Sequence, residues 1–449
     1  MHSILYMKAK NYLISLIIFC SIQLLPSSFL TAQALYFPPV GISQWQKASP
    51  SSLNYCKPEI DSLYNYLERN NTKAFILLKD GKVVLEKYFG TFTKDSSWEW
   101  REASQTLTAS LFGIAQSNNL IDIELPVQKY LGEAWTSLKS ENEAKITVAD
   151  HLKMTTGLKS NSRDHACTRP ECFDIKSNAG EEWSFHESSY LILEKIMEAA
   201  CDKSFNQFLF NSLRGTIGLS GSYSNDEETK TYRSNARAAA RFGLFLLARG
   251  SWEDKVLISD KTYFDQMISP SQELNPAYGY LTWVNGQDNY QLPQSSNTFD
   301  GELIPYAPSD LFAAFGTNGQ LINVVPSEGI VWVRFGDAPE IGNGAIPAIF
   351  NNNIWKRIQN LDCQAFTITK ESDDEHKLSP KPGKDEIRIS TKVPIIKLLI
   401  SDEAGKVYFA EDINSKKLSI NTKQFEKGIY FARIYFSEEI VSTQKFEVK

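Results

Sequence analysis

Apolar residues recur every three or four positions in some parts of this chain and alternate with polar residues in others. The first spacing is typical of one face of an α-helix, and the second of a half-buried β-strand. The helical spacing predicts helices over residues 57–70, 104–117, 188–200, 205–213, 235–248 and 346–358. Strands are predicted over 321–325, 330–335 and 74–89, the last interrupted by a turn at Asp80-Gly81. This order predicts a sheet formed from both ends of one unit, with a helical insertion between them.

The character of the chain changes near residue 370. Residues 370–385 are dense in charge, contain two prolines and a glycine, and have almost nothing to bury, which predicts a linker. Residues 386–449 alternate apolar and polar positions between turns at 403–405 and 427–428. This pattern predicts a small antiparallel β-sandwich. A chain of 449 residues is long enough for two such folded units.

Residues 1–34 have the composition of a signal peptide. Lys8 and Lys10 precede an apolar run over 13–25, and Ala32-Gln33-Ala34 supplies small residues for cleavage. Polar residues interrupt the run, so we expect it to be cleaved and to leave no stable membrane span. A lipoprotein signal at Cys20 is disfavoured because Phe19, just before it, is large.

Charge and histidine content limit the classes of partner. The formal net charge is −6 and no run of Lys or Arg is present, so nothing predicts a nucleic acid or an anionic membrane surface. The five histidines show no paired ligand spacing. We therefore expect no metal and no cofactor, and a small-molecule or peptide-like ligand.

Several segments carry a resemblance to a known superfamily. ASQTLTASLFGIAQSNNLIDIELPVQKYLG (103–132) and KITVADHLKMTTGL (145–158) resemble the start of the catalytic region in class C β-lactamase-like hydrolases. AGEEWSFHESSYLILEKIME (179–198) and FGTNGQLINVVPSEGIVWVRFG (315–336) extend the resemblance, which covers roughly residues 45–365. This superfamily of serine β-lactamases and penicillin-binding proteins includes esterases, amidases and D-amino-acid peptidases. The resemblance implies an α+β fold, in which N- and C-terminal helices flank an antiparallel sheet that carries a helical subdomain.

The resemblance also implies where catalytic residues would lie. Active members carry a serine and, three positions later, a lysine, because one helical turn brings the amine beside the hydroxyl. Here Glu102 and Gln105 stand at those positions. The family's tyrosine and asparagine fall on Phe185 and Glu187, and phenylalanine cannot relay a proton.

A third family motif, on a strand that ends in glycine, falls near Ala314 and Gly316 and is followed by Asn318. The same resemblance places Ser104, Tyr278 and Tyr280 at the expected cleft. Because nucleophile and base are both replaced, we interpret the domain as a pseudoenzyme that binds a peptide, amide, ester or cell-wall-like ligand.

Three alternatives remain open. The domain could persist only as an inert, stable body. It could be an active hydrolase of esterase or amidase type that uses Ser104 as an unrecognised nucleophile. Finally, Glu102 and Glu187 could form a pair that binds an amine or a divalent ion, or that acts as general acid and base.

The C-terminal unit carries a second resemblance. Residues 427–431 (KGIYF) and the final KFEVK are similar to the C-terminal sorting domain of the type IX secretion system of Bacteroidota. The resemblance implies recognition by that machinery, passage through the periplasm, and a secreted or cell-surface location. A generic immunoglobulin-like adhesion module is the alternative.

Export makes disulfides permissible. Cys167 and Cys172 enclose only Thr-Arg-Pro-Glu, which favours a local bridge. In the superfamily's fold the first and last helices pack side by side, which implies a second bridge between Cys56 and Cys363. Cys201 would then be free.

Overall fold

The computed structural model describes residues 35–159, 166–224, 231–295, 297–340, 346–362, 378–379, 386–402, 407–423, 425–435 and 441–448. They form two compact units, which divide between Leu361 and Asp362. The predicted signal peptide, Cys363 and most of the predicted linker lie outside the described residues. The α+β class is confirmed for the first unit.

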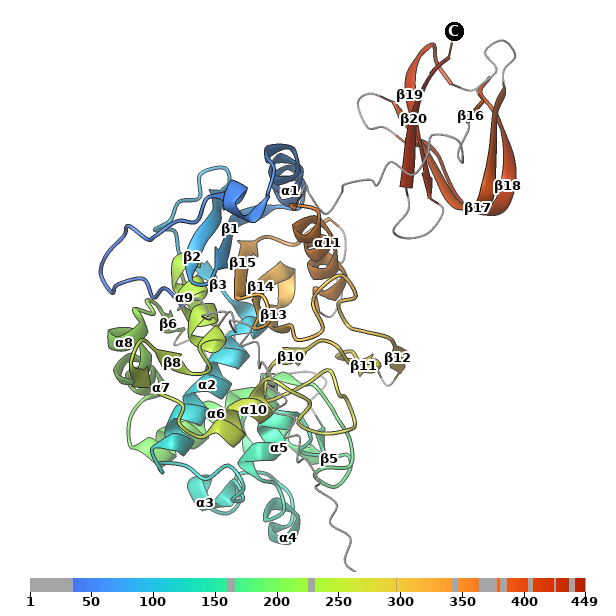
Figure 1. Ribbon diagram of the computed structural model, residues 1–449. Helices are drawn as coiled ribbons and strands as arrows, with labels where there is room; N and C mark the ends of the chain where they lie inside the picture. Colours follow the sequence, from blue (N-terminus) through green and yellow to red (C-terminus); the bar gives the residue numbers. More distant parts are fainter. Residues whose placement is uncertain are drawn as a thin grey trace, which may run out of the picture. The chain divides into compact units, whose positions relative to one another are not determined.

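The first unit is built on a six-stranded antiparallel sheet with the strand order β10-β13-β14-β15-β1-β2 (Figure 1). β1 and β2 come from the beginning of the unit and the other four strands from its second half, so both ends build one sheet, as predicted. The bounds are β1 (Thr72–Lys79), β2 (Lys82–Tyr88), β10 (Trp283–Val284), β13 (Phe312–Gly316), β14 (Gln320–Val325) and β15 (Ile330–Gly336).

The predicted turn between β1 and β2 has the expected backbone. Asp80 and Gly81 have φ values of 50° and 81°, which is the left-handed pair that a tight hairpin needs. Gly81 is required for a second reason, because a Cβ there would lie 1.9 Å from the carbonyl oxygen of Tyr36.

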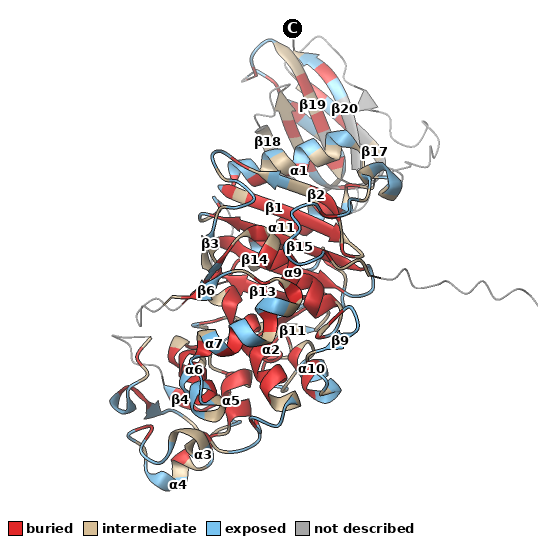
Figure 2. Ribbon diagram, turned by 90° about the vertical axis from the view of Figure 1, so that its left-hand side faces the viewer, coloured by how far each residue is buried: buried red, intermediate tan, exposed pale blue. Residues whose placement is uncertain are grey.

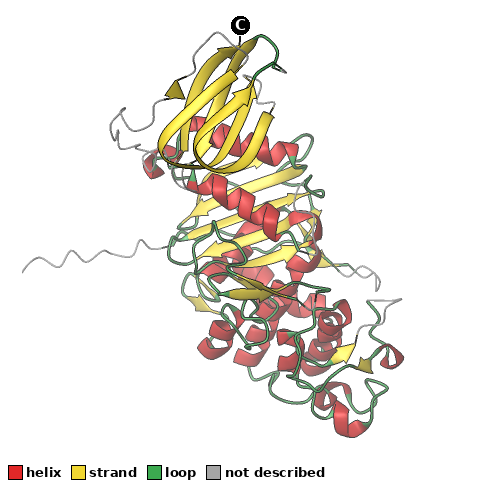
Figure 3. Cartoon of the chain, turned by 90° about the vertical axis from the view of Figure 1, so that its right-hand side faces the viewer, coloured by secondary structure: helices red, strands yellow, loops and turns green. Residues whose placement is uncertain are grey.

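Helices cover both faces of this sheet. These are α1 (Lys57–Arg69), α9 (Ala236–Leu247) and α11 (Ala348–Gln359). On β15, a Cβ at Gly243 of α9 would lie 2.5 Å from Val331, whereas the next residue, Trp332, packs on Trp355 of α11 with ring centroids 5.9 Å apart. Successive residues of a strand point to opposite faces. α9 therefore covers one face, and α11 covers the other together with α1, which packs beside it (Figure 3).

The remaining helices form the predicted helical part, with the buried α2 at its centre (Figure 2). Residues 104–115 of α2 are all buried, so this helix has no solvent face over most of its length. The helices are α2 (Ser104–Ser117), α3 (Gln128–Leu131), α4 (Ser140–Glu143), α5 (Val148–Lys153), α6 (Glu187–Cys201), α7 (Phe205–Leu209), α8 (Gly215–Ile217) and α10 (Lys261–Met267).

Short strands and single turns complete the unit. The strands are β3 (Trp98–Glu99), β4 (Leu158–Lys159), β5 (Asp174–Ile175), β6 (Ser222–Tyr223), β7 (Tyr232–Ser234), β8 (Ser251–Trp252), β9 (Lys255–Val256), β11 (Asn289–Gln291) and β12 (Thr298–Asp300). The 3₁₀ turns are η1 (Pro50–Leu53), η2 (Arg101–Ala103), η3 (Pro170–Cys172) and η5 (Thr317–Gly319), and a π-turn, η4 (Phe210–Arg214), continues α7.

The segment that precedes η1 covers the edge of the sheet. β2 is an edge strand, and its Val83 donates from its N–H to the carbonyl of Gln46 and accepts from the N–H of Ala48. An uncovered strand edge invites pairing with another chain. This segment therefore satisfies backbone groups that β2 would otherwise expose.

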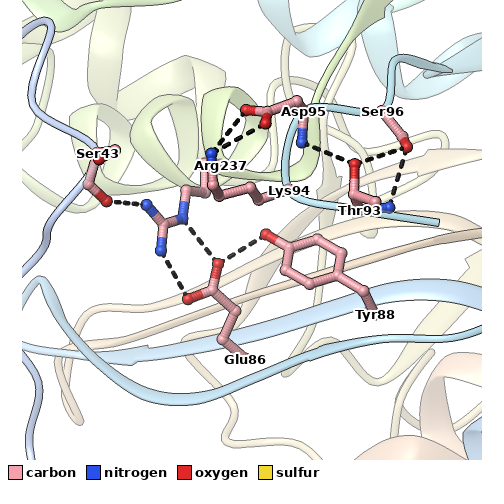
Figure 4. A network of polar contacts seen from close by, with 8 residues as sticks. All are labelled: Ser43, Glu86, Tyr88, Thr93, Lys94, Asp95, Ser96 and Arg237. Atoms are coloured by element: carbon pink, nitrogen blue, oxygen red, sulfur yellow. Dashed lines mark hydrogen bonds and ion pairs between the residues drawn. The ribbon is translucent and has the colours of Figure 1, made fainter.

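Two arginines of α9 hold this segment in place. Arg237 binds Glu86 through two hydrogen bonds of 2.7 and 2.9 Å and also donates to the carbonyl of Ser43 (Figure 4). The Trp45 ring lies 5.1 Å from the Arg237 guanidinium and 4.9 Å from that of Arg241. Such cation–π contacts fix the tryptophan against the helix.

The second unit is an antiparallel β-structure. β17 pairs with both β18 and β19, and β19 pairs with β20. β16, which falls within residues 370–385, pairs with β17. A separate apolar cluster, which includes Leu398, Ile400 and Ile434, forms its core. The bounds are β16 (Leu378–Ser379), β17 (Glu386–Asp402), β18 (Val407–Asn421), β19 (Gly428–Tyr435) and β20 (Val441–Val448).

The described cysteines agree with the predicted local bridge. Cys167 and Cys172 form a disulfide with their Cα atoms 5.9 Å apart, and Cys201 carries a free thiol. The N–H of Cys56 donates to the carbonyl of Leu361, which brings the beginning of α1 close to the chain that follows α11. Pairing of Cys56 with Cys363 stays a prediction, since Cys363 lies outside the described residues.

Candidate functional site

The predicted nucleophile position lies where the end of β13 meets η2. Gly316 closes β13, and a Cβ at that residue would lie 2.3 Å from the carbonyl oxygen of Trp100 and 3.0 Å from the nitrogen of Ala103. Only glycine allows so close an approach. The backbone of the next residue, Thr317, is thereby brought to the side chain of Glu102.

Glu102 uses its carboxylate to bind that backbone. Its Oε2 accepts a hydrogen bond of 2.7 Å from the N–H of Thr317, although the two residues are 215 positions apart. A backbone N–H aimed at the nucleophile position is the kind of donor that stabilises an oxyanion in acyl transfer. In this chain the Glu102 carboxylate, at the predicted nucleophile position, already accepts the hydrogen bond of that donor.

Four side chains gather around the phenol of Tyr190, which lies one helical turn after Glu187 on α6. They are Glu102, Gln105, Glu187 and Tyr278, and together with Tyr190 we call them the Tyr190 cluster. Burial raises the pKa of Tyr190 well above its usual value, and the charges of Glu102 and Glu187 raise it further, while Gln105 opposes the rise. The phenol therefore stays protonated at neutral pH and cannot serve as a base there.

Two polar side chains of the cluster are almost fully buried. Gln105 is 2% exposed and Tyr278 is 1% exposed. Among the described residues, the Oη of Tyr278 has no hydrogen-bond partner within standard geometry, whereas Gln105 lowers the pKa of Tyr190 as a hydrogen-bond partner of its phenol. A buried polar atom such as the Tyr278 Oη is uncommon because it has lost its hydrogen bonds to water without replacement.

Glu187 and Phe185 reach the cluster from the start of α6. Glu187 is the first residue of the helix, where the helix dipole favours a carboxylate. Phe185 keeps part of its surface exposed, and its ring centroid lies 6.3 Å from Trp183, 6.3 Å from Tyr278 and 6.4 Å from Trp283. These rings form an aromatic wall that includes Tyr278 of the cluster.

Ser104 has the surroundings of a structural residue. It is 3% exposed, and its Oγ donates a 2.8 Å hydrogen bond to the carbonyl of Arg101. Its own carbonyl accepts a 2.8 Å bond from the hydroxyl of Tyr223. The Ser104 hydroxyl is thus hydrogen-bonded to the backbone just before α2 and does not face a base.

The remaining predicted residues lie in different surroundings. Tyr280 is buried against Tyr263 and donates to Gln266, both on α10. Ala314 is buried in the middle of β13. Asn318 belongs to η5 and lines a small pocket of about 170 Å³ with Arg101 and Arg233. None of the three is among the groups that act on Tyr190.

Arg334 anchors the η5 turn that presents Thr317. This residue of β15 is fully buried, and its guanidinium donates to the carbonyls of Asn318, Gly319, Asn70 and Asp337 and to the Thr72 hydroxyl. Burial lowers the pKa of Arg334 to about 9, so the group remains charged at neutral pH.

We expect Arg334→Met to destabilise the first unit by at least about 3 kcal/mol, because several buried acceptors would lose their donors. The exposed Arg249, which pairs with Asp265, is the control, and Arg249→Met should cost less than about 1 kcal/mol. Urea unfolding followed by tryptophan fluorescence measures both. Equal losses in the two variants would contradict the anchoring role.

The residues that the structure describes contain neither a metal-binding cluster nor a membrane-spanning helix. In the described ranges, no group of three or more His, Cys, Asp or Glu side chains is arranged to hold a metal ion. No helix within those ranges combines the length and apolar character that crossing a bilayer requires.

Two contributors to the site were missed from the sequence, Thr317 and Tyr190. Thr317 acts through its backbone, so its residue type carries no signal. Tyr190 stands three positions after Glu187 in a predicted helix, a spacing that places both on one face. That spacing was available in the sequence.

Two family models match the chain. The model described as Beta-lactamase matches residues 68–335, and the model described as Secretion system C-terminal sorting domain matches residues 377–449. The second match indicates type IX export and a secreted or cell-surface location. No curated protein matches the sequence.

Solved structures resemble the first unit in fold. A candidate β-lactamase from Bacteroides dorei has a TM-score of 0.54 at 13% identity, covering 69% of this chain and 99% of its own. A candidate 6-aminohexanoate-dimer hydrolase from Bacillus anthracis has a TM-score of 0.54 at 18% identity, covering 72% and 89%. A penicillin-binding protein homologue from Caulobacter crescentus has a TM-score of 0.52 at 12% identity, covering 68% and 98%. Identities this low establish a shared fold alone.

Proposed function

Because the chain belongs to the Beta-lactamase family, we propose that its first unit is an exported pseudoenzyme, which binds a peptide, amide, ester or cell-wall-like ligand without acyl transfer. The observation that carries the proposal is the 2.7 Å hydrogen bond from the N–H of Thr317 to the carboxylate of Glu102. The nucleophile position holds an acidic side chain, and that side chain fills a backbone donor that an oxyanion would need.

The surroundings of Glu102 support the same proposal. Gln105, at the position of the base, is an amide and cannot accept a proton at neutral pH. The phenol of Tyr190 cannot replace it, because burial and two carboxylates keep that phenol protonated. A covalent mechanism would therefore have neither a nucleophile nor a base at these positions.

The test combines labelling with turnover. We expect the purified protein to show no mass increase with a fluorophosphonate probe or a fluorescent penicillin, and no turnover of activated esters or a chromogenic cephalosporin. The variant Ser104→Ala tests the alternative that the protein is an active hydrolase with Ser104 as its nucleophile. An adduct on Ser104, or ester turnover well above that of Ser104→Ala, would refute the proposal. Turnover that Glu102→Gln or Glu187→Gln abolishes would instead assign catalysis to the glutamate pair.

We also propose that residues 1–34 are a cleaved signal peptide, so that the chain reaches the type IX machinery from the periplasm. Truncation after Cys363 should leave a folded first unit that stays in the periplasm, because the sorting domain is removed while the predicted Cys56–Cys363 bridge is kept. Immunoblots of periplasmic and external fractions, with the full chain as control, measure the distribution. Normal appearance of the truncated protein outside the cell would contradict the sorting role.

A further inference from the structure

We propose that a second pocket of the first unit binds a small organic monocarboxylate. The pocket has a volume of about 170 Å³, and we call it the Arg101 pocket. Its lining shares no residue with the Tyr190 cluster, so the inference goes beyond the proposed function and does not depend on it. The residues used in the argument are Trp98, Glu99, Arg101, Arg233, Asn318 and Asp337.

Two guanidinium groups give the Arg101 pocket an excess of positive charge. Arg101 and Arg233 both pair with Glu99, the first through its Nη2 at 2.7 Å from Oε2 and the second through its Nη1 to Oε1. Because two cations share one carboxylate, one positive charge is left uncompensated. Asp337 does not cancel it, since its Oδ2 already lies 2.9 Å from the Nζ of Lys73. The pocket therefore favours a ligand with one negative charge.

The same two guanidinium groups can donate to such a ligand. Each carries five N–H donors in a planar fork that matches the geometry of a carboxylate, and Glu99 engages one nitrogen of each. The side chains of Arg101 and Arg233 are 40% and 46% exposed, so a ligand can reach their other nitrogens. Asn318 lines the same pocket, and its side-chain amide can add a further donor.

Two residues of the pocket have a backbone conformation that residues other than glycine rarely adopt. The φ values of Arg101 and Asn318 are 52° and 61°, in the left-handed region. Such strained residues are concentrated at ligand sites, where the surrounding structure holds them. The N–H of Arg101 donates to the Thr231 hydroxyl at 2.9 Å, and the carbonyl of Asn318 accepts from Arg334 at 2.7 Å. Both backbones are thus fixed before a ligand arrives, which reduces the entropy lost on binding.

The other lining residues limit the charge and the shape of the ligand. The carboxylates of Glu99 and Asp337 would repel the second negative charge of a phosphate or sulfate dianion. Trp98 is the one aromatic side chain among the described residues that line the pocket, and it can contact a small ring or alkyl group. A carboxylate carried on a compact apolar group satisfies both conditions.

Three probes test the charge preference. Benzoate and benzamide have nearly the same shape but differ in charge, and sulfate is a dianion. Calorimetric titration of the full chain near neutral pH, at one fixed ionic strength, compares their affinities. We expect benzoate to bind, benzamide to bind at least about tenfold more weakly, and sulfate at equal concentration not to displace benzoate.

Conservative variants locate the binding. Arg101→Gln and Arg233→Gln should each weaken benzoate binding about tenfold and leave the affinity for benzamide nearly unchanged. Asn318→Asp keeps the size of the side chain and tolerates the left-handed backbone, but it adds a negative charge and should weaken benzoate binding at least about tenfold. Arg249→Gln, at an exposed arginine that also pairs with a carboxylate, is the matched control and should bind benzoate as the native protein does.

Several results would overturn the carboxylate site. They are no benzoate binding up to about 10 mM, equal affinity for benzoate and benzamide, tighter binding of sulfate, or benzoate affinity unchanged in both Arg233→Gln and Asn318→Asp. Thermal unfolding verifies that each variant is folded, and these two variants decide the matter if Arg101→Gln is not. The pseudoenzyme proposal is measured separately by labelling and turnover, so either proposal can fail without the other.

Discussion

The combined variant Glu102→Ser, Gln105→Lys, Phe185→Tyr and Glu187→Asn is expected to react covalently with a fluorophosphonate probe, whereas the native protein is not. The substitutions restore the nucleophile, the base, a phenol and an amide at the positions that the resemblance assigns to them. Removal of the Glu102 carboxylate also releases the N–H of Thr317, which becomes available to an oxyanion. Intact mass spectrometry detects the adduct.

The single variant Glu102→Ser should remain unlabelled under the same conditions. A positioned base contributes roughly a hundredfold to ten-thousandfold to such a step, and Gln105 cannot accept the proton. Tyr190 cannot substitute, because burial keeps its pKa well above the usual value even without Glu102. Strong labelling of this single variant would mean that another base operates at the site and that the assigned roles are wrong.

Ser104 supplies the control for both variants. Adding Ser104→Ala should leave the labelling of the combined variant intact, since Ser104 is buried and donates to the carbonyl of Arg101. If Ser104→Ala abolishes the adduct, the probe has reacted with Ser104 and the experiment supports the hydrolase alternative. Thermal unfolding of each protein verifies that the substitutions have not disrupted the fold.

The secondary structure of the first unit could be predicted well because its apolar periodicity is strong. The helix predicted over 104–117 has the same bounds as α2, and the helix over 235–248 ends within one residue of α9. The helix predicted over 205–213 is less regular, since α7 ends at Leu209 and continues as a π-turn. The π-turn spans only five residues, which are too few for the apolar pattern to distinguish it from an α-helical turn.

The site could be predicted only in part. Resemblance placed Glu102, Gln105, Phe185 and Glu187, and the structure brings the two glutamates and Gln105 around one phenol. The bond between Glu102 and Thr317 could not be predicted, because it depends on how closely β13 approaches η2 across 215 positions. Tyr280 and Tyr278, both predicted at the cleft, lie in different surroundings, since the hydroxyl and ring of Tyr280 contact α10. Residues two apart outside regular strands need not share a face.

Acidification should destabilise the first unit through two buried histidines near the site. Burial lowers the pKa of His151 to about 4 and that of His186 to about 3, and the charges of His151 and Lys176 add to the second shift. His186 accepts a bond from the N–H of Ser189 through Nδ1, which caps α6 and requires that nitrogen to be unprotonated. His151 lies beside the carbonyl of Ser189 at 2.8 Å through Nδ1, so its buried Nε2 is the atom that would take the proton.

The direction in which stability changes with pH follows from the histidine pKa values in the folded and unfolded states. Unfolded histidines have a pKa near 6.5 and bind protons below that pH, whereas the folded ones stay neutral down to about pH 4 and pH 3. The unfolded state therefore binds more protons between those limits, and the free energy of unfolding falls as the pH falls through this window. At about pH 5 each histidine should remove about 2 kcal/mol relative to about pH 7.5.

Urea unfolding at these two pH values measures the loss, and tryptophan fluorescence reports the first unit because all nine tryptophans lie within it. The variant His151→Asn with His186→Asn is the test of cause. The side-chain nitrogen or oxygen of asparagine lies near the place of Nδ1, so it can cap α6 at position 186 and donate at position 151, yet it does not titrate. We expect this double variant to be less stable at about pH 7.5, because a smaller side chain fills each site, but to lose about 4 kcal/mol less on acidification. An unchanged pH dependence would show that carboxylates, rather than these two histidines, set the acid sensitivity of the fold.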